Sequence, residues 1–169
     1  MILDGFRKVN IRKRIKKELL RSDSLKARGN QKIDTILILV DENSQENLDQ
    51  IISKKLNIDV SKATTIFFKT NQDISNYECE LIDKGFSLFG KIKNEKIVKL
   101  VLSEFDLLLN YTNDNLYLNY VTVFSKAKFK VGLKANQQEI FDLIIDVDKN
   151  NVDLFHSELI KYLKILNKT

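Results

Sequence analysis

Residues 36–40 read Ile-Leu-Ile-Leu-Val, a continuous apolar run of strand length. Such a run is typical of a β-strand that is covered on both faces. Strands of this kind belong to parallel sheets, because crossover helices pack on both sides of the sheet. Asp41 to Ser44 then have the composition of a turn and helix N-cap, and residues 48–56 carry a helical apolar stripe. The run therefore predicts the first strand of an α/β fold.

The alternation of apolar strands and amphipathic helices continues to the end of the chain. Further strands are expected at residues 64–68, 86–89, 105–109, 129–132 and 141–147, and further helices near residues 97–104, 116–124 and 152–166. Thr112 or Asn113 is expected to cap the helix at 116–124. Residues 71–84 are polar and irregular and predict no element. The pattern indicates a Rossmann-like three-layer sandwich with a mostly parallel sheet of five or six strands.

A helix precedes this domain. Its apolar residues fall at roughly helical spacing, and the expected stripe is Phe6, Val9, Ile15 and Leu19, widened by Ile11 and Leu20. The segment from Ser22 to Asn30 has the composition of a loop. We therefore expect a basic N-terminal helical arm and linker over residues 1–30, followed by the Rossmann-like α/β domain over residues 31–169. An isolated helix this cationic is marginal in water, so its stripe must pack on the body or on a partner.

Composition indicates an ordinary globular chain. Of 169 residues, 43% are hydrophobic and 30% charged, so wholesale disorder is not expected. No apolar run is long enough to span a bilayer, and no apolar segment follows the N-terminal charges as in a secretory signal peptide. The single cysteine, Cys79, excludes an internal disulfide and suits a reducing compartment. The expected location is the cytoplasm.

The net charge of +5 is unevenly distributed. Residues 1–35 carry eleven Lys and Arg against four Asp and Glu, a net +7, whereas the remaining residues sum to −2. A nearly neutral body with a cationic arm indicates an anionic partner for the arm. The basic residues expected to contact that partner are Arg7, Lys8, Arg12, Lys13, Arg14, Lys16, Lys17 and Arg21.

We interpret this cluster as a site for RNA or for a ribonucleoprotein such as the ribosome, since Lys and Arg contact phosphates without reading sequence. Two alternatives remain open. The helix could lie on an anionic membrane surface as a peripheral contact, although Phe6 is its only aromatic anchor. Its charge could also serve only to solvate a helix that docks on the sheet, which would favour a protein–protein interaction module.

A second candidate site lies where the predicted strands end. Its possible ligand-binding residues are Asp41, Asn110, Asp146 and Asp148, and Asn113 to Asn115 fall nearby. In open α/β sheets ligands bind at the carboxyl ends of the strands, and carboxylates there could hold a divalent cation or a small substrate. The alternative is that Asp and Asn simply form turns and helix caps. If these residues do form a site, the alternative function is a small-molecule- or metal-dependent enzyme that works at the strand ends; the identity of a metal is not predicted.

Catalytic motifs are absent from the sequence. None of the five glycines forms a dinucleotide-binding or P-loop motif, and Asp41 and Glu42 after the first strand would repel a phosphate. His156 is the only histidine, so a site with several imidazoles is excluded, and a packing or surface role is expected. Cys79 has no local basic helper beyond Lys84. We therefore expect a binding protein without catalytic residues or a cofactor; oligomeric state is not predicted.

Two resemblances concern the C-terminal half. The segments FDLLLNY, VTVFSKAKFKVGL, DLIID and YLKIL, at residues 105–111, 121–133, 142–146 and 162–166, resemble an uncharacterised bacterial family of short α/β proteins with no assigned function. More distantly, residues 105–110 and 127–132 are similar to one βαβ stretch of heptosyltransferase-type glycosyltransferases. That similarity covers under a fifth of the chain. It implies a shared Rossmann-like half and no transferase activity.

Overall fold

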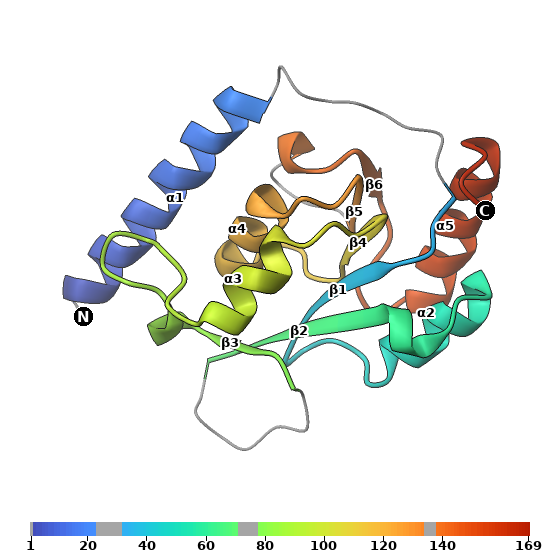
Figure 1. Ribbon diagram of the computed structural model, residues 1–169, viewed down its shortest axis with the longest axis horizontal. Coiled ribbons are helices and arrows are strands. Elements are labelled where there is room, and N and C mark those ends of the chain that lie inside the picture. Colours follow the sequence, from blue (N-terminus) through green and yellow to red (C-terminus); the bar gives the residue numbers. More distant parts are fainter. Residues whose placement is uncertain (1, 23–31, 71–77, 134–137) are drawn as a thin grey trace.

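The computed structural model describes residues 2–22, 32–70, 78–133 and 138–169 (Figure 1). Its centre is a six-stranded sheet in the order β3-β2-β1-β4-β5-β6, in which every neighbouring pair is parallel. The strands are β1 (Ile36–Asp41), β2 (Ala63–Lys69), β3 (Glu80–Ile82), β4 (Leu107–Asn110), β5 (Phe129–Leu133) and β6 (Leu143–Ile145). The predicted parallel sheet of a Rossmann-like fold is thereby confirmed.

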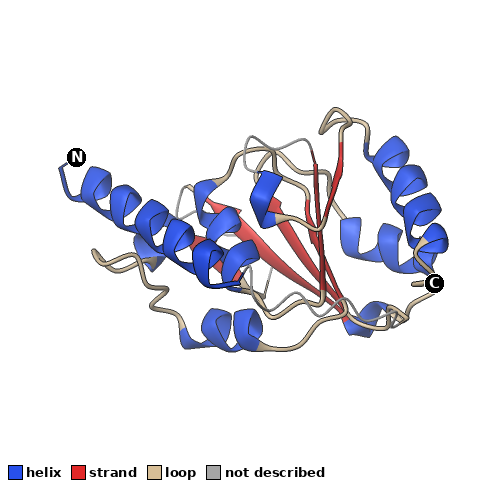
Figure 2. Cartoon of the chain, turned by 90° about the horizontal axis from the view of Figure 1, so that it is seen from above, coloured by secondary structure: helices blue, strands red, loops and turns tan. Residues whose placement is uncertain are grey.

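The described ranges contain five α-helices around the sheet. They are α1 (Ile2–Ser22), α2 (Leu48–Leu56), α3 (Glu95–Leu102), α4 (Leu116–Phe124) and α5 (Val152–Ile165). Helices α3 and α4 cover one face, and α2 and α5 cover the other (Figures 1 and 2). Helix α1 packs on α4, outside the first of these layers. The arrangement is a three-layer sandwich with one additional helix on its flank.

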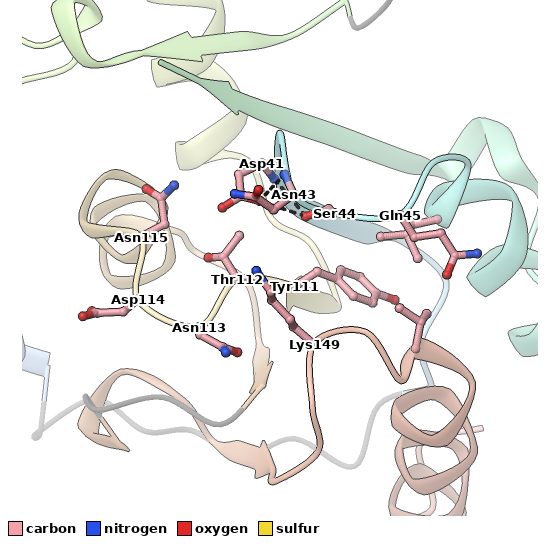
Figure 3. Close-up of a pocket in the computed structure, with 12 residues that line it drawn as sticks. Asp41, Asn43, Ser44, Gln45, Tyr111, Thr112, Asn113, Asp114, Asn115 and Lys149 are labelled. Carbon is pink, nitrogen blue, oxygen red and sulfur yellow. Dashed lines mark hydrogen bonds between the residues drawn. The ribbon is translucent and has the colours of Figure 1, made fainter. Parts of the chain in front are cut away.

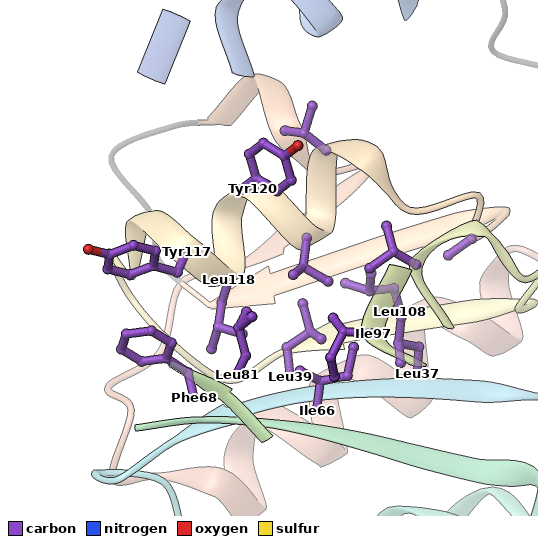
Figure 4. Packing of buried hydrophobic residues seen from close by; sticks show 14 of the residues in the cluster. Leu37, Leu39, Ile66, Phe68, Leu81, Ile97, Leu108, Tyr117, Leu118 and Tyr120 are labelled. Atoms are coloured by element: carbon purple, nitrogen blue, oxygen red, sulfur yellow. The ribbon is translucent and has the colours of Figure 1, made fainter. Parts of the chain in front are cut away.

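The two sides of β1 explain why its sequence is apolar throughout. Leu37 and Leu39 point into the core under α3 and α4, where Leu108 and Leu118 also lie (Figure 4). The alternate residues of β1 point into a second core under α2 and α5. All five residues from 36 to 40 are at most 2% exposed. Burial on both faces leaves no position for a polar side chain until Asp41, where the strand ends.

Several predicted boundaries are wrong. Residues 86–89 form a loop rather than a strand, and Phe86 makes only an isolated antiparallel bridge to Ile92. The third strand is instead Glu80–Ile82, which lies within residues 71–84, where the sequence predicted no element. Helix α4 is capped by Asn115, whose side chain accepts hydrogen bonds from two backbone N–H groups, rather than by Thr112 or Asn113. The predicted linker after Ser22 falls outside the described residues.

Only half of the apolar stripe predicted for α1 packs inward, namely Ile11, Ile15 and Leu19. Ile11 and Ile15 are buried, whereas Phe6 and Val9 are 53% and 45% exposed. Gly90 fixes this orientation, because the loop that it occupies lies directly against the backbone of α1. A Cβ at Gly90 would come within 2.9 Å of the Ile11 nitrogen, and its φ of +73° is in the region that favours glycine.

The strand order creates a crevice between β1 and β4. From β1 the chain runs through α2, on one face of the sheet, to β2; from β4 it runs through α4, on the other face, to β5. The two loops that leave the carboxyl ends of β1 and β4 therefore diverge. Crevices at such a switch point are where open α/β sheets bind ligands.

Candidate functional site

The exposed side of α1, which we call the outer face, carries most of the predicted basic residues. Six of the eight are exposed: Lys8, Arg12, Lys13, Lys16, Lys17 and Arg21. They form two rows with a spacing of four residues, one from Lys8 to Lys16 and one from Lys13 to Arg21. Because a helix rises 1.5 Å per residue, neighbours in each row are about 6 Å apart along the axis. The structure thus brings these six side chains together on one surface.

Arg7 and Arg14 are the two predicted residues that turn inward. The Arg7 guanidinium forms an ion pair with Asp4 at 2.9 Å, and only 12% of its side chain is exposed. The Arg14 Nε donates a hydrogen bond to the Tyr120 hydroxyl at 3.4 Å, and its guanidinium lies 5.5 Å from the centre of the Phe124 ring. Arg14 therefore attaches α1 to α4, whereas Arg7 pairs within α1, and neither adds to the outer face.

The outer face has little internal charge compensation. Its two acidic neighbours on α1, Asp4 and Glu18, each lie seven residues from Ile11 and hence on the packed side of the helix. Among the six outer-face cations only Arg21 pairs with one of these acids, Glu18, at 3.5 Å. The other five cations, Lys8, Arg12, Lys13, Lys16 and Lys17, have no ion-pair partner among the residues that the structure describes. Like charges at a spacing of four residues destabilise a helix, so this surface favours an anionic partner.

A second feature is a polar pocket at the crevice between β1 and β4, which we call the switch-point pocket (Figure 3). Its volume is about 230 Å³. Three loops form its walls: residues 41–45 after β1, residues 111–115 after β4, and the turn before α5, which contributes Lys149. The buried side chains of Leu48, Tyr111, Thr112 and Val152 lie beneath these walls. The pocket therefore combines an apolar floor with a polar rim.

Only one of the four residues predicted for a strand-end site lines this pocket. Asp41 is at its edge. Asn110 is fully buried, and its side-chain amide is used inside the protein by Thr112 and Thr122. Asp146 and Asp148 are exposed and are not part of the lining, and Asp148 accepts a hydrogen bond from the Asn150 N–H in a turn.

Sequence reasoning missed several residues that do line the pocket, namely Ser44, Gln45, Tyr111 and Lys149. The first three could have been predicted from their position in the sequence, because they lie within a few residues of the end of β1 or β4. Lys149 had no such signal. It reaches the pocket because β6 is at the sheet edge while its following turn runs back over the crevice toward α5 (Figure 3).

A buried polar pair supports the pocket floor. The Tyr111 hydroxyl and the His156 Nε2 are 2.7 Å apart, and both residues are buried. Burial, together with the nearby charge of Lys55 and against the opposing effect of Asp153, lowers the pKa of His156 to about 4. Burial also raises the pKa of Tyr111. Both side chains are therefore neutral at pH 7, and the pair holds the Tyr111 ring in place.

Metal coordination finds no support in the described part of the chain. Among those residues, no three His, Cys, Asp or Glu side chains are grouped as metal ligands would be. Cys79 is buried, which agrees with a packing role. No helix in the described ranges has the length and apolar character needed to cross a bilayer.

Comparison with known proteins gives one match. The model of a family of unknown function, DUF6913, matches residues 7–166 and so includes most of α1 together with the whole sheet. No curated protein and no solved structure matches the chain.

Proposed function

We propose that this chain, which belongs to the DUF6913 family of unknown function, is a binding protein that engages RNA through the outer face of α1. The observation that supports the proposal is the pair of basic rows on that face, where five cations have no ion-pair partner in the described structure. Such rows contact phosphates and release counterions, so binding is strong at low salt and independent of sequence. A ribonucleoprotein such as the ribosome would present exposed RNA phosphates to these rows.

The pattern of apolar side chains favours RNA over a membrane surface. An in-plane membrane helix needs a continuous apolar face that enters the lipid. On α1 the exposed Val9 and Leu20 are separated by Lys13 and Lys16, which lie four or seven residues from each and so on the same line. Leu3, Phe6 and Val9 form a short exposed apolar run at the start of α1, but beyond Val9 that line is interrupted by charge and does not continue along the helix. Anionic vesicles nevertheless form one arm of the test below.

The experiment compares full-length variants, because removal of α1 would uncover the core that Ile11 and Ile15 cover. The test variant combines Lys13→Gln, Lys16→Gln and Lys17→Gln; the control combines Lys54→Gln, Lys161→Gln and Lys164→Gln on α2 and α5. All six lysines are exposed, and Gln has a helix propensity close to that of Lys. The two variants have the same net charge and lose it from different faces; the control also removes the exposed Lys161–Glu158 pair, which contributes little to stability.

Affinity for a labelled oligouridine is measured by fluorescence anisotropy between about 50 and about 200 mM potassium chloride. With six phosphate contacts, the logarithm of the association constant falls with the logarithm of salt at a slope of about −4. The test variant should show a slope of about −2, and the control variant should match the wild type. Equal weakening of both variants, or binding to anionic vesicles without binding to the RNA, would contradict the proposal.

We propose no enzymatic activity from the other two sequence-based expectations, the glycosyltransferase similarity and the strand-end site. The similarity of residues 105–132 to heptosyltransferase-type enzymes stays a prediction about a shared half-fold. The alternative function is an enzyme that works at the strand ends, and the switch-point pocket is where its substrate would bind. The described residues supply the pocket with neither a metal cluster nor an activated nucleophile, so we propose binding and no reaction there.

A further inference from the structure

We propose that the switch-point pocket binds a neutral, polyhydroxylated ring of monosaccharide size. This site is separate from the outer face of α1 and does not depend on RNA binding. The pocket lies at the crevice where this class of sheet binds ligands, and its volume of about 230 Å³ suits one ring rather than a dinucleotide.

The rim of the pocket offers unused hydrogen-bonding groups of both kinds. The side-chain amides of Asn43, Gln45 and Asn113 have no hydrogen-bond partner among the described residues (Figure 3). Each amide offers a donor and an acceptor, which is what a pair of vicinal hydroxyls requires. On Asp41, Oδ1 accepts hydrogen bonds from Asn43 and Ser44, whereas Oδ2 has no partner in the described structure.

A carboxylate at the opposite end of the sheet has a purely structural role and provides a contrast to the rim of the pocket. Asp106 lies just before β4, and its Oδ2 accepts hydrogen bonds from the Asp34 N–H and from the Thr35 N–H and hydroxyl. Its Oδ1 accepts a hydrogen bond from Lys128 at 2.9 Å. Both oxygens of Asp106 are therefore used within the fold, while the strand-end groups of the pocket are left for a ligand.

The floor suits the carbon face of a sugar ring. Leu48 and Val152 are 3% and 8% exposed, and the Tyr111 ring lies between the loops with its hydroxyl directed to His156 on α5 (Figure 3). Because that hydroxyl is already bonded, the Tyr111 ring offers the pocket an apolar surface. A sugar ring matches this combination, since its C–H groups can pack on the floor while its hydroxyls reach the rim.

The pocket is poorly suited to phosphate. At the N-termini of α4 and α5, capping side chains already accept from some of the N–H groups that would bind an anion: Asn115 from two on α4, and Asn151 from that of Leu154 on α5. The charges around the rim, Asp41, Asp114 and Lys149, sum to a slightly negative value. These features favour a neutral ligand, whether a free monosaccharide or the ribose of a nucleoside.

The test is a protein-observed NMR titration of the full chain with D-ribose, D-glucose, adenosine and adenosine monophosphate. We expect saturable shifts in the amides of residues 41–45 and 111–115 with a sugar or with adenosine. A response to ribose or glucose alone identifies a free sugar, and tighter binding of adenosine than of ribose identifies a nucleoside. Deoxyribose should bind about tenfold more weakly than ribose, because one hydroxyl is missing and its partner is left unpaired.

The variant Asn43→Ala with Asn113→Ala removes one amide from each wall and should weaken binding about tenfold or more. Gln50→Ala removes an exposed amide on α2 outside the pocket and should leave affinity unchanged. Retained amide dispersion shows that both variants remain folded. No saturable shift with ribose, glucose or adenosine overturns the proposal, as does binding of adenosine monophosphate without adenosine, or an unchanged affinity in the double variant.

Discussion

Helices α1 and α5 lie at the two ends of the chain and pack on opposite sides of the molecule, yet their exposed charges differ. Each buries an apolar stripe, through Ile11 and Ile15 on α1 and through Leu159 and Leu163 on α5. Helix α5 carries two acidic and two basic residues, and Lys161 pairs with Glu158 within it. Helix α1 carries eight basic residues and two acidic ones.

The comparison separates the charge needed for solubility from the charge available to a partner. A helix packed on one side needs only a polar outer surface, which α5 achieves with balanced charge. Exposed apolar residues do not distinguish the two, since Leu20 on α1 and Ile165 on α5 are similarly exposed. The uncompensated cations of α1 exceed what solvation requires, and this excess is the reason to assign a partner to α1.

The largest expected effect concerns the buried stripes, where the two helices should behave alike. Ile11→Ala and Leu159→Ala each remove a side chain that is fully buried, and each should lower the free energy of unfolding by about 2–5 kcal/mol. Urea denaturation of the full chain measures both values. A loss below about 1 kcal/mol for Ile11→Ala would mean that α1 is not docked in solution, and the comparison would fail.

A pH-dependent effect of similar size is expected on α5 alone. His156 has a folded-state pKa of about 4, below its usual value of 6.5. The unfolded chain therefore binds more protons in this interval, and stability falls as pH decreases from about 6.5 to about 4, by about 3 kcal/mol in total. Because His156 is the only histidine, its ring resonance in an NMR titration reports this pKa directly. A measured pKa above 6 would show that the side chain is not buried beside Tyr111.

The seating of α1 on the loop at Gly90 should give a smaller effect. Gly90→Ala forces a residue with a Cβ into positive φ and places that atom against the backbone of α1. We expect a loss of about 1–3 kcal/mol in the free energy of unfolding. Gly85→Ala is the matched control, because a Cβ there meets only side-chain atoms at 3.6 Å or more. Equal stability of the two variants would contradict the described packing of α1.

The smallest effect on stability should come from the exposed lysines, and its sign distinguishes the helices. Lys13→Gln with Lys17→Gln relieves repulsion between like charges four residues apart and should stabilise the protein by a few tenths of a kcal/mol. Lys161→Gln removes a cation that faces Glu158 and should be neutral or slightly destabilising. Thermal unfolding at low salt measures both. A clear loss of stability in the α1 variant would indicate that its lysines have structural partners.

The sequence predicts much of the fold because buried parallel strands have a simple signature. The apolar run at residues 36–40 has strand length and is followed by turn residues, which is typical of a strand covered on both faces. Strand β3 escaped prediction because it is a three-residue edge strand, too short for any periodicity. The stripe predicted for α1 combined two apolar lines of one helix, and only the surface formed by α4 and the Gly90 loop selects the line of Ile11 and Ile15.

The candidate sites were predictable to different extents. A basic surface is a property of neighbouring residues on one helix, so six of the eight predicted cations do lie together on α1. The switch-point pocket combines three loops that are distant in sequence, and only Asp41 of the four predicted residues lines it. Asn110 follows the same strand-end rule, but its amide is needed inside the core, a use that no local pattern reveals.

The most direct test of RNA binding by α1 is amide chemical-shift mapping of the full chain with an oligouridine at low salt. The account predicts that the strongly shifted amides lie in residues 8–21, with those of α5 at residues 152–165 unchanged, and that added salt reverses the shifts. Shifts centred on α5, on the loops of the switch-point pocket or on no region at all would contradict it.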